Sequence, residues 1–298
     1  MEKLLFTGGT GFLGKNIMPL LIQQYEVTTC GITQDDQLNA NLAKEVPVLP
    51  GKFDVVLHAC GKAHMIPKTE KEKQAFFDVN YQGTVNLCEG LEKVGAPKSL
   101  IFISTCSVYG VEKGELIAED TPLKTDTPYG KSKLMAEEYL QEWCKKNKVV
   151  LTILRPSLLA GKGAPGNLGA MVNGISRGFY VNIAGGKARK SILMAEDIGR
   201  LIPLVENKGG VYNVCDSAQP SYGELSASIA RQMGKKAPLS IPYWMAWGLA
   251  KVGDCLGGKA PINSYRLEKL VSTCTFSNEK ARHELGWEPL NVIEYFKI

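Results

Sequence analysis

The feature that most constrains this chain is a glycine-rich turn between its first apolar run and its first amphipathic stretch. Residues 7–14 read TGGTGFLG, and three of the glycines are spaced three apart: Gly8, Gly11 and Gly14. The run Leu4–Thr7 predicts a strand, and Phe12–Gln24 has helical spacing. Glycine allows the positive φ and the close backbone approach that such a turn needs, and the helix N-terminus then faces an anion such as a pyrophosphate.

Beyond this turn, the first half of the chain alternates runs of β-branched residues with longer amphipathic stretches. Strands are expected at residues 26–30, 54–58, 100–104 and 149–154, and helices at residues 71–93 and 128–146. The helix over 71–93 should stop at Gly95-Ala96-Pro97, because proline cannot supply the amide that a further turn needs. This alternation is typical of a parallel sheet covered by helices.

The regular alternation of strand and helix patterns ends after Arg155-Pro156. Residues 161–169 hold four glycines and one proline, which predicts a loop, and helices and short strands then mix less regularly. We expect an α/β fold with a Rossmann doubly wound parallel sheet and a smaller C-terminal substrate-binding region. The sheet domain should contain residues 1–160, with 190–215 returning to it, and the substrate-binding region should contain residues 161–189 and 216–298.

Composition and charge narrow the class of protein. Apolar residues make up 44% of the 298 residues and charged residues 22%, as in ordinary globular chains, and the net charge of +5 includes no basic block. We therefore expect no nucleic-acid partner. The eight cysteines are scattered, which favours reduced thiols, and with only three histidines a metal site is not expected.

No targeting or membrane segment is expected. The apolar start of the chain runs straight into the glycine turn and is too short for a secretory signal. The most apolar later segment, Ile241–Leu249, is far short of the roughly 20 residues that span a bilayer, and we interpret it as a buried or partner-facing helix. The expected location is the cytoplasm, with no membrane partner.

The end of the second predicted strand leaves the type of dinucleotide open. Dinucleotide-binding sheets usually carry an acid there, which binds the ribose of NAD, whereas this strand ends at Cys30-Gly31. Asp35 and Asp36 come a few residues late, and no Arg or Lys follows the strand to bind the 2′-phosphate of NADP. The cofactor is therefore expected to be NAD or NADP.

A tyrosine followed four residues later by a lysine places both side chains on one helix face. The lysine charge can lower the pKa of the tyrosine and make its phenol a usable acid or base. The spacing occurs three times: Tyr109/Lys113, Tyr129/Lys133 and Tyr265/Lys269. The first pair is broken by glycine and predicts a loop, and the third lies far downstream. Tyr129/Lys133 opens a helix after a strand that ends in hydroxyl residues, so we select it as the catalytic pair.

Seven motifs together, in this order, resemble the extended short-chain dehydrogenases, also called the NAD-dependent epimerase/dehydratase family. They are TGGTGFLG (7–14), DVVLHA (54–59), NYQGTVN (80–86), FISTCSVYG (102–110), YGKSK (129–133), RP (155–156) and LGWEP (285–289). The resemblance runs from residue 3 to about residue 289. It implies an enzyme that binds NAD or NADP and acts on a nucleotide-diphosphate sugar.

The resemblance also implies roles for single residues. Tyr129 matches the acid/base, Lys133 the residue that binds the nicotinamide ribose and tunes the tyrosine, and Thr105 the hydroxyl that bonds the reacting sugar oxygen, with Ser104 and Ser107 as close alternatives. The positions that match the cofactor site are Gly8, Gly11, Phe12, Leu13, Gly14, His58, Ala59, Asn80 and Lys133. His58 is more simply read as a buried strand histidine than as a catalytic base.

Farther on, Lys190 holds the place where relatives usually have the arginine that binds the substrate diphosphate, with Arg189 adjacent. A lysine can neutralise a phosphate but cannot make the planar bidentate contact. This departure leaves the substrate contact less well defined than the fold.

Three functions follow from the resemblance. The first is a nucleotide-sugar 4-epimerase, the second a reductase of a 4-keto nucleotide sugar with the same residues, and the third a cofactor-binding protein without catalysis, which the retained Tyr129 and Lys133 disfavour. The resemblance also suggests a homodimer through a helical bundle, for which four leucines offer apolar surface: Leu87, Leu91, Leu134 and Leu140.

Overall fold

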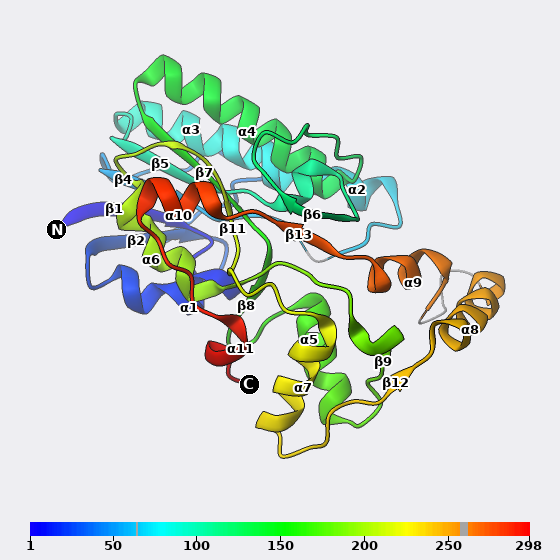
Figure 1. Ribbon diagram of the computed structural model, residues 1–298. Helices are drawn as coiled ribbons and strands as arrows, with labels where there is room; N and C mark the ends of the chain where they lie inside the picture. Colours follow the sequence, from blue (N-terminus) through cyan, green and yellow to red (C-terminus); the bar gives the residue numbers. More distant parts are fainter. Residues whose placement is uncertain (64, 257–261) are drawn as a thin grey trace.

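The computed structural model describes residues 1–63, 65–256 and 262–298. At its centre lies a seven-stranded sheet in the order β11-β7-β5-β4-β1-β2-β3, with every neighbouring pair parallel (Figure 1). Its strands are β1 (Glu2–Thr7), β2 (Tyr25–Gly31), β3 (Leu38–Asn39), β4 (Val55–His58), β5 (Ser99–Ile103), β7 (Val150–Pro156) and β11 (Gly210–Val214). The expected doubly wound α/β fold is confirmed, and its strand order turns back between β1 and β4.

Helices cover both faces of the sheet. One face carries α1 (Phe12–Leu21), α6 (Ala195–Val205) and α10 (Glu279–Leu285), and the other carries α3 (Gly83–Val94) and α4 (Pro128–Asn147). Successive strand residues point to opposite faces, so Leu4 and Phe6 join the first core cluster while Leu5 joins the second. The near-continuous apolar strands of the sequence reflect burial on both faces.

The helix expected over residues 71–93 is present but interrupted. It consists of α2 (Glu70–Phe77), the π-helical turn η1 (Asp78–Gln82) and α3. A capping box of Thr69 and Glu72 starts it, and Gly95 with a φ of 101° ends it. Wider turns of this kind are frequent at functional sites, and this one contains Asn80.

Outside the central sheet, the chain forms small parallel pairs of strands, helices and 3-10 turns, most of them beyond residue 156. The pairs are β8 (Leu158–Ala160) with β10 (Ile192–Met194), β9 (Asn182–Ile183) with β12 (Ser240–Ile241), and β6 (Gly114–Ile117) with β13 (Cys274–Phe276). The helices are α5 (Gly166–Ser176), α7 (Tyr222–Gln232), α8 (Tyr243–Leu256), α9 (Ser264–Val271) and α11 (Val292–Tyr295), and the 3-10 turns are η2 (Cys106–Tyr109) and η3 (Ala184–Gly186).

Two expectations for this part need refinement. Of the segment expected to return to the sheet, only β11 does so, because β10 pairs with β8. The loop expected over residues 161–169 is shorter, since α5 begins at Gly166. The division into a sheet domain and a substrate-binding region stays a prediction.

The leucines expected to form a dimer surface lie inside the protein. Leu87, Leu91 and Leu140 are fully buried in the core between the sheet and α3 and α4, and Leu134 packs against another buried cluster. That apolar surface was therefore wrongly predicted, because Leu87, Leu91 and Leu140 face the sheet and Leu134 is half-buried against the cluster around η2 and β13. The homodimer itself stays a prediction without this support.

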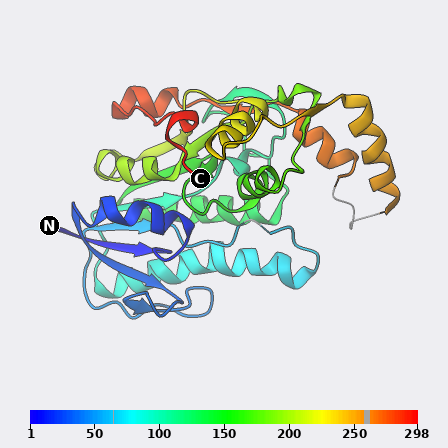
Figure 2. The same cartoon turned by 90° about the horizontal axis from the view of Figure 1, so that it is seen from below.

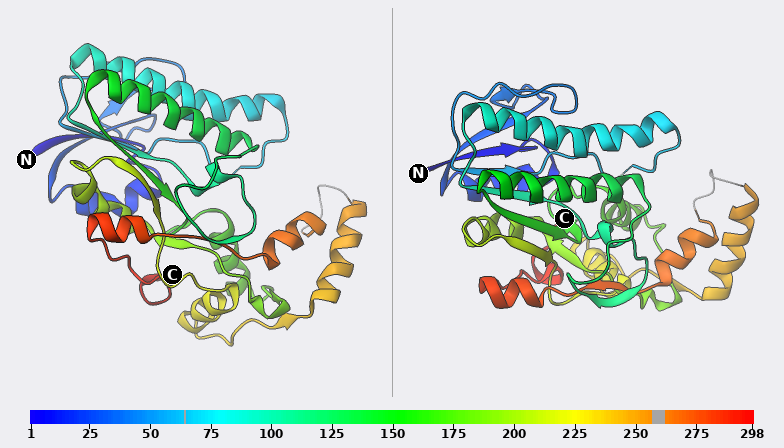
Figure 3. Two further views of the ribbon diagram at one scale, coloured as in Figure 1. Left: turned by 45° about the horizontal axis from the view of Figure 1, so that its top comes forward. Right: turned by 90° about the horizontal axis from the view of Figure 1, so that it is seen from above.

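The helix predicted around Ile241–Leu249 is present as α8, but it is not buried. Only its small residues Ala246, Ala250 and Gly253 are covered. Figure 2 shows α8 and α9 at the end of the molecule opposite the N-terminus, and Figure 3 shows α8 as the outer member of the pair. Over the described ranges, no helix is both long and apolar enough to cross a membrane.

Candidate active site

The glycine turn lies at the carboxyl end of β1, beside the point where the strand order reverses. Gly8 has a φ of 81°, and a Cβ on it would lie 2.9 Å from the backbone nitrogen of Cys60. A Cβ on Gly14 would overlap the carbonyl of Gly9. Gly11 begins α1 without a side-chain cap, so the amides of the first turn, which includes Phe12 and Leu13, remain available to an anion.

Asp36 occupies the place of the acid that the sequence lacked at the end of β2. Its carboxylate folds back over Gly31, where a Cβ would overlap it. Oδ2 accepts hydrogen bonds from the Thr33 amide at 3.1 Å and the Thr33 hydroxyl at 2.8 Å. Oδ1 is buried without a hydrogen-bond partner. A buried carboxylate oxygen left free at this position fits the ribose hydroxyls of a dinucleotide.

His58 ends β4 as a structural residue. Its ring nitrogens lie 2.7 Å from the Thr7 hydroxyl and 2.9 Å from the Thr84 hydroxyl, and the side chain is 1% exposed. Burial first, and then the charge of Lys133, lower the pKa of His58 to about 3. The imidazole therefore stays neutral, and only the backbone of His58 and Ala59 is left to border the site.

Asn80 holds the loop after β4 against α4. Its amide oxygen accepts from the Lys62 amide at 2.7 Å, and its amide nitrogen donates to the Lys62 carbonyl at 3.1 Å and to the Ser132 hydroxyl at 2.9 Å. A Cβ on Gly61 would lie 3.0 Å from Lys133 Nζ and 3.1 Å from Asn80 Oδ1. The π-helical turn thus places Asn80 next to Lys133.

Tyr129 and Thr105 meet where β5 ends and α4 begins. Thr127 caps α4 by accepting from the Gly130 amide, with Pro128 in the first turn. Burial raises the pKa of Tyr129, and the nearby Thr105 hydroxyl, as a hydrogen-bond donor to the phenol, opposes this effect. The expected lowering of the pKa was wrong in direction, because desolvation outweighs every favourable contact.

Lys133 lies one turn farther along α4 and is 4% exposed. Its ammonium donates to the Ile103 carbonyl at 2.9 Å and lies 4.6 Å from the centroid of the Phe102 ring. Burial lowers the pKa of Lys133 to about 8, against the opposing influence of Cys60 and Glu137. A buried amine with a pKa near neutrality is a common property of catalytic lysines.

A buried ionic network joins α4 to the neighbouring strands of the sheet. Arg155 Nη2 lies 2.6 Å from Glu137 Oε2, and Arg155 Nη1 donates to the Tyr109 hydroxyl at 3.0 Å. The Ser104 hydroxyl also donates to Glu137, and Tyr109 donates to Asn213 at 2.7 Å. Since Glu137 follows Lys133 by one turn, the network fixes α4 against β5 and β7. Because the Ser104 hydroxyl is engaged by Glu137, Thr105 is favoured over Ser104 as the hydroxyl that contacts the substrate.

The other two tyrosine–lysine pairs lie in different surroundings from Tyr129 and Lys133. Tyr109 is fully buried in that network, in a 3-10 turn ended by Gly110. Tyr265 is exposed on α9 and donates to Glu112 at 2.6 Å, while Lys269 pairs with the same carboxylate at 2.9 Å.

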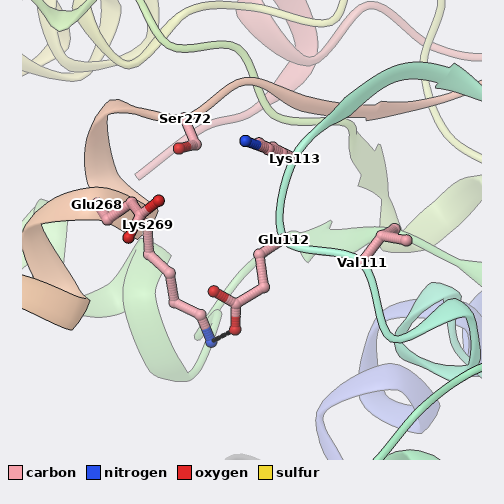
Figure 4. Close-up of a pocket in the computed structure, with 6 residues that line it drawn as sticks. All are labelled: Val111, Glu112, Lys113, Glu268, Lys269 and Ser272. Carbon is pink, nitrogen blue, oxygen red and sulfur yellow. Dashed lines mark ion pairs between the residues drawn. The ribbon is translucent and has the colours of Figure 1, made fainter.

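A cavity of about 310 Å³ lies between α9 and the loop that follows η2. It is lined by Val111, Glu112, Lys113, Glu268, Lys269 and Ser272. Figure 4 shows Lys269 and Glu112 pointing toward one another across it. The half-buried Lys190 lies within electrostatic reach of both, and burial lowers its pKa. This group of cations is a candidate contact for a substrate diphosphate.

Arg189 and Lys190 point to different neighbours. Arg189 donates to the Gln219 carbonyl at 2.9 Å and lies 3.6 Å from Glu224 on α7. The structure therefore brings Tyr129, Lys133 and Thr105 together at the sheet edge and places Arg189 against α7. For metals, the described part of the chain has no group of three or more His, Cys, Asp or Glu that could hold an ion, and His64 lies outside it.

The sheet and its carboxyl edge define a dinucleotide-binding α/β protein of the Rossmann type. Residues 4–215 match the NAD dependent epimerase/dehydratase family, and the chain belongs to that family. The resemblance found in the sequence, the enzyme class and a nicotinamide dinucleotide as cofactor are thereby confirmed.

Relatives at moderate identity span nearly the whole chain. An N-acetyl-alpha-D-glucosaminyl-diphospho-ditrans,octacis-undecaprenol 4-epimerase of Escherichia coli O157:H7 is 29% identical, and the match covers 96% of this chain and 90% of the relative. A UDP-glucose 4-epimerase of Vibrio cholerae is 27% identical over 98% of this chain and 92% of the relative. The structure of a UDP-glucose 4-epimerase from Thermotoga maritima with UDP-glucose has a TM-score of 0.75 at 22% identity, covering 99% and 96%.

Proposed function

We propose that this protein is an NAD(P)-dependent 4-epimerase of a sugar carried on a diphosphate, with Tyr129 as its acid and base. The observation that carries the proposal is the grouping of the half-buried Tyr129 with the buried Thr105 and Lys133 at the carboxyl edge of the sheet, in a member of the epimerase family. The curated relatives described above are 4-epimerases, which favours this reaction over the reduction of a 4-keto sugar.

The proposed reaction needs one proton to leave and return at the C4 oxygen of the sugar. When bound, NAD(P) supplies the hydride acceptor and donor. Tyr129 holds its proton near neutrality because burial raises its pKa, so it is ready to protonate the sugar oxygen in the reductive half. In the oxidative half Tyr129 must first be ionised: its phenolate accepts the proton of the C4 hydroxyl, which Thr105 orients, and the phenol so formed returns that proton in the reductive half. Lys133, with a pKa of about 8, exchanges protons near neutrality.

The residues proposed to hold the cofactor are those that border the switch point of the sheet. The uncapped first turn of α1 receives the pyrophosphate, and Asp36 receives the ribose hydroxyls. An acid at that position also repels a 2′-phosphate, so we propose NAD as the preferred dinucleotide. Lys133 is proposed to contact the nicotinamide ribose, with Asn80 positioning the loop beside it.

The test is turnover on a panel of UDP-, dTDP- and GDP-sugars with mass and NMR analysis of the products. Inversion at C4 without net consumption of NAD(P)H supports the epimerase. A product that forms only from a 4-keto sugar, with stoichiometric oxidation of NAD(P)H, would instead establish the reductase.

A second candidate keeps the reaction and changes the carrier to a polyprenyl diphosphate, as in the name of the E. coli relative. The observation that favours it is the exposed apolar helix α8, which a substrate dissolved in water does not require. In either case Lys190 and Lys269 are proposed to neutralise the diphosphate, because the two cations lie within electrostatic reach of each other and Lys269 lines the cavity beside α9.

A further inference from the structure

The exposed apolar side chains of this protein gather on one segment. We call the described residues 235–256 and 262–273, which contain α8 and α9, the arm. Ten of the 24 large apolar side chains that are exposed among the described residues lie between positions 239 and 270. They are Leu239, Tyr243, Trp244, Met245, Trp247, Leu249, Val252, Leu256, Tyr265 and Leu270. Surface patches of this density usually bind something.

The apolar surface of α8 extends around most of the helix. Ala246, Ala250 and Gly253 form the narrow stripe that is covered, with Ala246 and Ala250 in a cluster with Leu267 of α9. One exposed flank carries the aromatic residues Tyr243, Trp244 and Trp247, and the other carries Met245, Leu249, Val252 and Leu256. A helix that is apolar on several sides belongs in an apolar medium, since a single protein surface covers only one side.

The net positive charge of the arm favours an anionic lipid surface over a second copy of the chain as its partner. The residues of the arm, 235–256 and 262–273, contain five basic and two acidic side chains, so the arm carries a net charge of +3. Two arms facing each other in a dimer would repel, whereas a surface of anionic lipid would attract each of them. Tryptophan and tyrosine favour the bilayer interface, and the ammonium of Lys251, 5.6 Å from the centroid of the Trp247 ring, suits the headgroup layer.

Polar contacts join the arm to the loop after η2, a few residues beyond the catalytic edge, by which we mean the end of β5 and the start of α4 that carry Thr105, Tyr129 and Lys133. Asp254 at the end of α8 accepts from the Ser264 amide at 2.9 Å at the start of α9. From α9, Tyr265 and Lys269 reach Glu112 on the loop that follows the turn after Thr105. Contact of α8 with a surface would therefore bring its neighbour α9, which lines one side of the cavity, close to that surface (Figure 3).

We propose that the arm docks on a bilayer containing anionic lipid, with α8 lying in the interface, so that the enzyme reaches a sugar carried on a membrane-embedded polyprenyl diphosphate. This inference rests on the proposed function. It replaces the expectation of no membrane partner, which considered only segments long enough to span: α8 has 14 residues, and interfacial binding needs no span.

The test is cosedimentation of the full chain with vesicles of phosphatidylethanolamine and phosphatidylglycerol, and with vesicles of phosphatidylcholine alone. The parent should bind the anionic vesicles more tightly, and high salt should weaken that binding. The double variant Trp244→Gln/Trp247→Gln should lose roughly tenfold or more of the bound fraction. Tyr295→Gln, an exposed aromatic residue outside the arm, is the matched control and should bind like the parent.

Activity assays separate this inference from the proposed function. Turnover of a water-soluble UDP-sugar should be equal in the parent and in the double variant, whereas turnover of a sugar-diphospho-polyprenol in vesicles should fall with binding. Vesicle binding as described with no epimerisation of any sugar would sustain the docking and overturn the function. A parent that binds no vesicles, or a double variant that binds as well, overturns the docking. So does a parent dimer that becomes a monomer in the double variant, because a second copy would then cover α8.

Discussion

The catalytic edge and the arm depart from the ordinary distribution of residues in opposite directions. At the edge, groups that usually face water are buried: Lys133, Glu137 and Arg155 are all at most 4% exposed. On the arm, groups that usually lie in the core are exposed, with Trp244 at 71% and Trp247 at 50%. Both cost free energy in isolation. The buried polar groups find partners within the chain, whereas the exposed apolar groups of the arm are the basis of the external partner proposed above.

Tyr129→Phe should give the largest effect and test the edge directly. The substitution leaves the ring but removes the group that transfers the proton, so epimerisation should fall by about 10² to 10⁴ while dinucleotide binding persists. Steady-state kinetics and dinucleotide titration measure the two properties. Tyr265→Phe is the control with the same spacing on the arm and should stay within roughly tenfold of the parent. Tyr109→Phe is a poor control, because its hydroxyl belongs to the buried network. Equal losses in the Tyr129 and Tyr265 variants would contradict our choice of pair.

Lys133→Met should separate activity from stability. It should abolish most turnover, yet raise the free energy of unfolding at pH 7 by about 1–3 kcal/mol, because burial holds the pKa of Lys133 at about 8 instead of 10.5. Since the lowered pKa disfavours the charged form, the parent regains this stability as pH rises from about 8 toward 10.5, and the variant has nothing to regain. Urea unfolding at pH 7 and pH 10 measures the difference. A variant less stable than the parent at both pH values would show that the bond to Ile103 outweighs desolvation.

His58 should make the edge sensitive to acid. Its pKa of about 3 in the folded protein lies below the ordinary 6.5, so its contribution is complete above pH 6.5 and is lost as pH falls toward 3. The loss is about 1.4 kcal/mol per pH unit, or roughly 2 kcal/mol between pH 6.5 and pH 5. His58→Gln keeps the ability to bond Thr7 and Thr84 without titrating, so its unfolding free energy should vary less over that range. Identical slopes for both proteins would assign the acid sensitivity elsewhere.

Motifs with a fixed backbone requirement could be predicted from the sequence. The glycine turn, the strand ending at His58 and the start of α4 at Pro128 lie where they were expected, because local sterics and capping decide them. The positions missed depend on contacts between distant residues. The fold of Asp36 over Gly31 and the π-helical turn around Asn80 follow from how a loop and a helix meet the sheet.

The sequence also did not reveal which apolar helix faces are buried inside the protein and which are exposed. The leucines Leu87 and Leu91 of α3, like Leu140 of α4, mark the apolar face of each helix. The pattern does not say whether the sheet or a second subunit covers that face. Similarly, the apolar run at residues 241–249 predicted a helix, but it did not predict that most large apolar side chains of α8 would be exposed. The raised pKa of Tyr129 also depends on burial, which the spacing to Lys133 does not reveal.

Asp36→Asn should change the choice of dinucleotide by about tenfold. Removing the charge weakens the contact with the ribose hydroxyls of NAD and removes the repulsion of a 2′-phosphate, so the ratio of the dissociation constants for NADH and NADPH should shift toward NADPH. Fluorescence titration with both reduced cofactors measures the ratio. Asp35→Asn is the matched control, since Asp35 is the exposed neighbour, and should leave the ratio unchanged. An equal shift of this ratio in both variants would show that it reflects the general surface charge and not a contact of Asp36 with the ribose.

The smallest expected effect concerns the stability of the arm. Trp244→Ala should change the free energy of unfolding by no more than about 0.5 kcal/mol, because the side chain makes few internal contacts to lose. Trp287→Ala is the comparison, since Trp287 is 1% exposed in the main core and its truncation should cost about 3–5 kcal/mol. Chemical denaturation without lipid measures both. A large loss for Trp244→Ala would mean that the arm folds back onto the protein in solution, and its apolar surface would then need no external partner. A small loss combined with weaker vesicle binding would show that this tryptophan acts outside the fold.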